Sequence, residues 1–123
     1  MGWDGAEKRN FVRADFPCKI VIYTPRKHTL VSHTEDIGAG GVRVIIEENL
    51  DISSLVGLEI FLSDAQISCK GRIVWVVEKP DSGNNESSSW DTGIEFYEID
   101  EKDKKTIDRF VNTIISKDDL RKS

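Results

Sequence analysis

The first 99 residues alternate short runs of β-branched and aromatic residues with turn-forming residues, and this alternation constrains the fold most. The runs predict strands at about 16–23, 29–35, 42–47, 58–62, 67–78 and 90–99. Turns are predicted at 24–27, which contains Pro25, and at the glycine-rich segment 38–41. A short apolar connection is expected at 52–56, and the Ser, Asn and Gly residues of 80–89 predict a loop at a hairpin tip.

One helix is predicted after the strands. Asp100 stands where a residue would cap that helix, and Asp103 stands where a capping box places its acid. Apolar residues then recur at the spacing of a single helical face, at Ile107, Phe110, Val111, Ile114 and Ile115. We expect this stripe to pack on the strands, with an oligomer contact as the alternative.

Together these elements predict an all-β fold with a terminal helix. The arrangement that we expect is a six-stranded antiparallel β-barrel plus a C-terminal α-helix, because closing a sheet removes its exposed edges. The same pattern also fits an open sandwich.

Composition narrows the class of protein. Apolar residues make up 38% and charged residues 32% of the 123 residues, which fits one soluble domain with one core. No apolar run reaches the roughly 18–20 residues of a membrane span, and the N-terminus does not resemble a secretory signal. We therefore expect a cytoplasmic protein with no membrane span. The net charge of −5 disfavours a nucleic acid polymer as partner, although neighbouring arginines could still bind a small anion.

The cysteines and histidines do not suggest a metal or catalytic site. Cys18 and Cys69 have no second cysteine or histidine at ligand spacing, so reduced packing residues are expected, with a disulfide as the alternative. His28 and His33 are expected to be ordinary strand or loop residues. Since the chain also lacks a nucleophile elbow and a P-loop, we expect no cofactor and no enzymatic activity.

Two short patterns carry more information together than apart. Arg9 and Arg13 form an R-x-x-x-R directly before the first predicted strand, and residues 36–41 form a D-x-G-x-x-G between the second and third. Alone, paired arginines usually lie on a solvated face, and an aspartate before glycines often caps a turn. In this order and strand context they resemble the PilZ domain family, which carries R-x-x-x-R ahead of its first strand and D/N-x-S-x-x-G later. Residues 55–62, 71–75 and 93–96 resemble the downstream strands of that family, so the resemblance covers about residues 7–115.

The resemblance implies a PilZ-like barrel over residues 9–116, between a flexible lead-in (1–8) and a tail (117–123). It implies a receptor that binds cyclic di-GMP, changes conformation and signals in trans to a downstream protein that the sequence does not identify. The alternative is a PilZ-like protein-interaction domain with weak or no nucleotide binding. The ligand-binding residues that the resemblance implies are Lys8, Arg9, Arg13, Asp36, Gly38 and Gly41.

These residue types suit the chemistry of such a ligand. A guanidinium fork can pair with a phosphate or with guanine O6 and N7, and it can stack on a purine. The carboxylate of Asp36 can accept hydrogen bonds from the Watson–Crick edge of guanine. Glycines let backbone N–H groups approach closely and tolerate a positive φ. Because two arginines without an anion repel each other, residues 1–13 are expected to be mobile alone and ordered with ligand.

One position departs from the family pattern. Gly38 stands where the family has Ser, and a lost hydroxyl hydrogen bond costs about 0.5–1.5 kcal/mol to a neutral group or about 1.5–3 kcal/mol to a charged one. We therefore expect micromolar binding that is weakened rather than abolished. Lys8 occupies the position that the family associates with binding one ligand or a stacked pair, and it leaves the stoichiometry open.

Overall fold

The computed structural model describes residues 13–14, 16–63, 65–79 and 88–122, with the backbone alone for 13–14 and 116–122. The expected lead-in at 1–8 lies outside the described residues. The elements are β1 (Arg13–Ala14), β2 (Lys19–Tyr23), β3 (Thr29–Gly38), β4 (Gly41–Ile46), β5 (Leu55–Phe61), β6 (Gln66–Lys79), β7 (Ser89–Glu98) and α2 (Glu101–Lys122).

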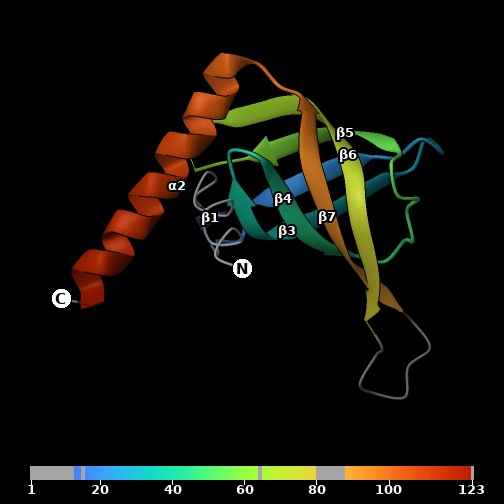
Figure 1. Cartoon of the computed structure of the whole chain (residues 1–123), viewed down its shortest axis with the longest axis horizontal. Coiled ribbons are helices and arrows are strands. Elements are labelled where there is room, and N and C mark those ends of the chain that lie inside the picture. The colour runs from blue at the N-terminus through green and yellow to red at the C-terminus, as the bar shows by residue number, and fades with distance from the viewer. Residues whose placement is uncertain (1–12, 15, 64, 80–87, 123) are drawn as a thin grey trace, which may run out of the picture.

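The six strands β2 to β7 form a closed antiparallel barrel (Figure 1). They pair in the order β3–β2–β5–β6–β7–β4, and β4 pairs back with β3 to complete the ring. The short β1 pairs with the C-terminal end of β3, beyond the residues that pair with β2, and Arg13 lies opposite Gly38. The predicted six-stranded barrel is therefore confirmed, and the open sandwich is excluded.

Aliphatic side chains fill the barrel interior because alternate residues of each strand point inward. In β2, for example, Ile20 and Ile22 are fully buried and lie opposite Ile60 and Leu58 of β5. The other strands contribute in the same way. The buried side chains with almost no exposed surface include Ile37, Val42, Val44, Ile67, Ile73 and Ile94.

The helix α2 lies along one side of the barrel, and Figure 1 shows it running from the end of β7 past β1. It begins directly after Asp100, as predicted. Ile107 and Val111 are fully buried, and the ring of Phe110 meets Phe16 edge to face with centroids 5.5 Å apart. The predicted apolar stripe is thus confirmed as packing against the barrel.

Several predicted element boundaries are wrong. The first long strand begins at Lys19 and not at about residue 16, and β3 continues to Gly38 and does not end at about residue 35. The segment 52–56 is not wholly a connection, because Leu55 and Val56 pair with β6 and begin β5, while Ile52 is 59% exposed. The predicted turn at 38–41 shrinks to residues 39–40, since Gly38 pairs with both Gly41 and Arg13. As a result, residue 36 lies inside a strand and not in a turn.

Cys18 and Cys69 are free thiols, as predicted. Burial raises the pKa of Cys69 to about 12, with a smaller contribution from the charge of Asp103. Burial also raises the pKa of Cys18, against the opposing effect of its hydrogen bond with Thr34.

No helix in the described part of the chain is long and apolar enough to cross a membrane.

Candidate functional site

Four residues form a row across the outer face of the barrel. Asp36 of β3 lies opposite Arg43 of β4, Arg43 lies opposite Gly93 of β7, and Gly93 lies opposite Trp75 of β6. The row crosses a shallow pocket of about 420 Å³, a volume typical of a small-molecule site. The remaining described lining comprises Gly40, Gly41, Val42, Val74, Ile94 and Glu95.

A β-bulge in β3 turns Asp36 toward this pocket. Thr34 pairs with Val44 and Asp36 pairs with Arg43, so Glu35 is an extra residue without a partner in the register. Without the bulge, Asp36 would share the inward face of the buried Thr34. Because the bulge shifts the alternation by one residue, Asp36 points outward and the next residue points into the core.

A second bulge, in β6, does the same for Trp75. Ile73 pairs with Ile94 and Trp75 pairs with Gly93, which leaves Val74 as the extra residue. Ile73 is fully buried, whereas the Trp75 residue is 38% exposed. Bulges therefore set the outward direction of both residues that end the row.

The indole of Trp75 lies directly over Gly93. A Cβ atom on Gly93 would stand only 2.2 Å from Nε1 and 2.3 Å from Cε2 of that ring. Only a residue without a side chain allows this approach. The result is a partly exposed aromatic surface held against the barrel at the pocket, of the kind on which a nucleobase stacks.

The charge of the site comes from Arg43 and its two carboxylates. Nε and Nη2 of Arg43 donate to Oδ1 and Oδ2 of Asp91, both at 2.8 Å. Nη1 of Arg43 lies 3.8 Å from Oδ2 of Asp36, which is too long for a hydrogen bond. The hydrogen bonds to Asp91 raise the pKa of Arg43, so the guanidinium stays charged. The two carboxylate side chains are 17% and 16% exposed, against 38% for the arginine.

Gly41 has a packing reason to be glycine. A Cβ atom there would lie 2.2 Å from the carbonyl oxygen of Ile94 and 2.9 Å from Cα of Glu95, so the residue allows the backbones of β4 and β7 to approach. None of the described glycines has a positive φ. In the described part of the chain, the non-glycine residues with positive φ are Lys27 and Ser53.

The predicted site residues are brought together only in part. Asp36 and Gly41 line the pocket, and Gly38 is buried beside the turn. The backbone of Arg13, in β1, lies opposite Gly38. Lys8 and Arg9 lie outside the described residues.

Sequence reasoning missed Arg43, Trp75, Asp91 and Gly93. The available signals were an arginine two residues after the glycine motif and a tryptophan within the aliphatic run of residues 73–77. Both signals need the strand register before they point to the pocket.

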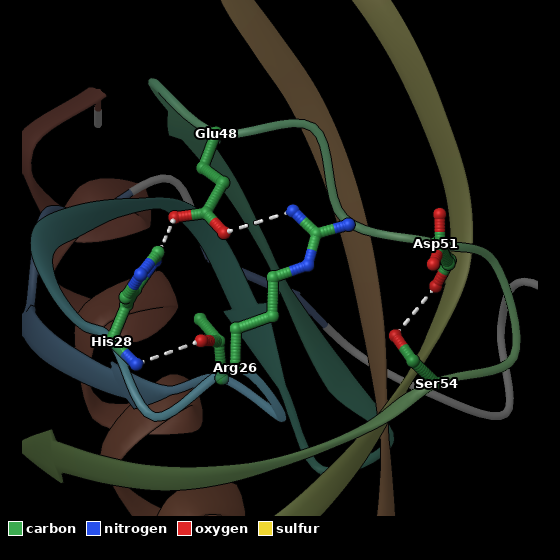
Figure 2. A network of polar contacts seen from close by, with 6 residues as sticks. Arg26, His28, Glu48, Asp51 and Ser54 are labelled. Atoms are coloured by element: carbon green, nitrogen blue, oxygen red, sulfur yellow. Dashed lines mark hydrogen bonds and ion pairs between the residues drawn. The ribbon is translucent and has the colours of Figure 1, made fainter.

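A separate polar cluster lies beyond the far end of β4 (Figure 2). Oε1 of Glu48 lies 3.2 Å from Nδ1 of His28, and its Oε2 lies 3.8 Å from Nη1 of Arg26. The backbone N–H of His28 donates to Oγ1 of Thr24 within the turn after β2. The contacts of Glu48 with His28 and Arg26 join this turn to the segment after β4. The described lining of the pocket includes none of these residues. Their contacts fit the predicted structural role of His28.

No three His, Cys, Asp or Glu side chains within the described ranges gather closely enough to hold a metal ion.

The family model that matches the sequence is that of the PilZ domain, over residues 7–113. A comparison with curated proteins finds no match.

Several solved structures share the fold. The inhibitor of motility MotI/DgrA from Bacillus subtilis is 21% identical, with a TM-score of 0.70 over 85% of this chain and 50% of that chain. The PilZ domain of YcgR from Escherichia coli, solved with c-di-GMP, is 13% identical, with a TM-score of 0.72 over 93% and 96%. MrkH from K. pneumonia, also solved as a c-di-GMP complex, is 14% identical, with a TM-score of 0.74 over 92% and 54%. The chain thus spans about half the length of MotI/DgrA and MrkH.

Proposed function

Because the chain belongs to the PilZ domain family, we propose that it binds cyclic di-GMP at the pocket between Asp36 and Trp75 and passes that signal to a partner protein in trans. The observation that carries the proposal is the outward row on the barrel. It combines the motif aspartate, a charged guanidinium and a partly exposed indole at one pocket.

Each part of the row suits a feature of the ligand. The indole of Trp75 offers a face on which guanine can stack, a contact worth about 1–3 kcal/mol per base. The carboxylate of Asp36 can accept from the N–H groups of guanine. Arg9 and Arg13 are proposed to hold the phosphates through guanidinium forks, and the pairing of Arg13 with Gly38 supports this for the second arginine. Gly38 supplies no hydroxyl, so the affinity is expected to be micromolar.

The comparisons support the same ligand. The PilZ domain of YcgR and the protein MrkH were both solved with c-di-GMP, and both share this barrel. The proposed role is binding and signalling, without catalysis and without a metal or organic cofactor.

The position of β1 suggests how binding could reach a partner. This strand contacts both β3, which carries Asp36, and the helix α2. A ligand that engages Arg13 would therefore act on a strand that contacts both β3 and the helix. We therefore propose that binding changes the packing of α2 and that the partner protein recognises this change.

Isothermal titration calorimetry with cyclic di-GMP tests the binding step, with GTP and cyclic GMP as controls. We expect micromolar binding of cyclic di-GMP and no comparable heat from either control. A flat titration at high micromolar ligand would favour the alternative of a protein-interaction domain. A Trp75→Phe variant adds a second test, since it should lose most of any ligand-induced change in tryptophan fluorescence.

A further inference from the structure

We propose that the uncovered edge of β6 binds the same edge of a second copy of this chain, with the two strands antiparallel around Val77. The inference goes beyond the proposed function and does not depend on it. It assigns a self-association surface to the hairpin of β6 and β7. It also brings Lys79 of the second copy next to Trp75, which lines the pocket.

The edge is uncovered because β6 is longer than the strand beside it. β6 has 14 residues, whereas β5 has 7. The backbone contact on this side ends at Ile73, whose N–H donates to the carbonyl oxygen of Ser54 and whose own carbonyl oxygen accepts from Ser53. Figure 1 shows the rest of β6 continuing beside β7 toward the hairpin tip. Residues 74–79 therefore have β7 on one side and no backbone hydrogen bond to a described residue on the other.

A turn before β5 directs the chain away from this edge. Ser53 has a φ of 78°, which is uncommon for a residue other than glycine. The N–H and Oγ of Ser54 both donate to the carbonyl oxygen of Asp51, at 3.1 and 2.6 Å, and Figure 2 shows the side-chain contact. The neighbouring Ile52 is 59% exposed. The segment that precedes β5 thus leaves β6 at this turn and does not pair with the rest of the strand.

The uncovered backbone groups belong to Val76 and Glu78. Successive residues of an antiparallel strand direct their N–H and C=O groups to opposite neighbours. Phe96 of β7 donates its N–H toward β4, and β7 pairs with β4 without a register shift. Asp91, an odd number of residues earlier, therefore directs its groups toward β6, where it pairs with Val77. Val77 thus bonds to β7, and the residues on either side of it direct their N–H and C=O groups away from β7.

These groups are all satisfied when Val77 lies on the two-fold axis of a dimer. Val76 of each strand then lies opposite Glu78 of the other, and every N–H of these residues donates to a C=O across the interface. Pairing around Val76 or around Glu78 leaves part of these groups without a partner. Pairing around Glu78 also sets like charges opposite each other, which is unfavourable.

The side chains of β6 suit this register. Val77 is 56% exposed, and on the axis it packs against its own copy. Lys79 lies opposite Trp75 of the second copy, because both are two positions from Val77 and share the outer face. An ammonium group beside an indole forms a favourable cation–π pair. The second copy thus adds a cation beside the pocket.

Disulfide trapping in the whole chain tests the register. At a non-hydrogen-bonded pair of an antiparallel sheet the Cα atoms are about 4.5 Å apart, which allows a disulfide. Under mild oxidation Val77→Cys should therefore form a covalent dimer at least about tenfold faster than Val31→Cys. Val31 is the matched control because it is a valine of β3 that is 62% exposed. The wild type controls for Cys18 and Cys69.

Variants of the two charged residues check the pairing. Glu78→Pro removes an N–H that β7 does not use, so the hairpin should persist while the second copy loses a hydrogen-bond donor. In the Val77→Cys background it should reduce trapping to the rate of Val31→Cys, whereas Glu78→Gln should leave trapping unchanged. Lys79→Ala gives a measurement that needs no proline. Sedimentation equilibrium should show its dimer weakened about fivefold, because a cation–π pair is lost on each side of the axis.

The outcomes are decisive either way. Equal trapping of Val77→Cys and Val31→Cys, or a wild type that stays monomeric at high micromolar concentration, would overturn the inference. An unweakened Lys79→Ala dimer would overturn the register. Amide exchange at Val76 and Glu78 should slow as protein concentration rises. Slow exchange already in dilute monomer would mean that another part of the same chain covers the edge, which also overturns the inference. Calorimetry with cyclic di-GMP tests the proposed function separately.

Discussion

Two glycines on the barrel, Gly93 and Gly41, should respond differently to the same substitution. Ala at position 93 should lower the affinity for the ligand, whereas Ala at position 41 should lower the stability of the fold. Replacing either by Ala places a Cβ atom 2.2 Å from its nearest neighbour. At Gly93 that neighbour is the indole of Trp75, a side chain that can swing into solvent. At Gly41 it is the backbone oxygen of Ile94, which the β4–β7 pairing holds in place.

The expected changes in stability and affinity depend on which group the new Cβ atom displaces. In Gly93→Ala only the indole is displaced, so the free energy of unfolding should change by less than about 1 kcal/mol, because Ala in a strand also recovers about 0.5–1 kcal/mol relative to Gly. The displaced indole should cost about 1–3 kcal/mol of base stacking, which is about 5- to 150-fold in affinity for cyclic di-GMP. In Gly41→Ala the overpacked backbone should lower stability by about 1–3 kcal/mol, or about 4–12 °C in Tm.

Urea unfolding and calorimetric titration of both variants provide the test. A double-mutant cycle gives the control, since Gly93→Ala should have no further effect on binding in a Trp75→Ala background. If Gly93→Ala destabilises the protein as much as Gly41→Ala while leaving the affinity unchanged, the assignment of Trp75 as a stacking surface is wrong.

Three further predictions concern the motif residues and a thiol. Gly38→Ser should tighten cyclic di-GMP binding several-fold in calorimetry, because φ at Gly38 is not positive and Ser can adopt this backbone; an unchanged or weaker constant would contradict this. Replacing either Arg9 or Arg13 by Ala should weaken the binding of cyclic di-GMP by about 2–5 kcal/mol. A loss of affinity below about threefold would exclude the phosphate contact of that arginine. Since the folded pKa of Cys69 is raised from 9.0 to about 12, its contribution to stability is complete below pH 9 and is lost as pH rises toward 12. Below pH 9 the folded protein should therefore react slowly with a thiol reagent, and rapid labelling of Cys69 would count against its burial.

Local pattern alone determined much of the fold. The alternation of apolar residues predicted six strands, and the stripe that includes Ile107 and Val111 predicted the helix that packs on them. Such patterns are visible in the sequence because each depends on residues only a few positions apart. The same is true of Asp36 and the glycines after it, which form a continuous motif.

Only the tertiary structure decided which side chains share the pocket. Arg43 and Asp91 are 48 residues apart and meet because β4 pairs with β7. Asp36 and Trp75 face outward because a bulge shifts the alternation in each of their strands. A slip of one residue turns a side chain to the opposite face of a sheet. The direction of these residues therefore depends on strand register, which is set by pairing across the closed barrel and not by neighbours along the chain.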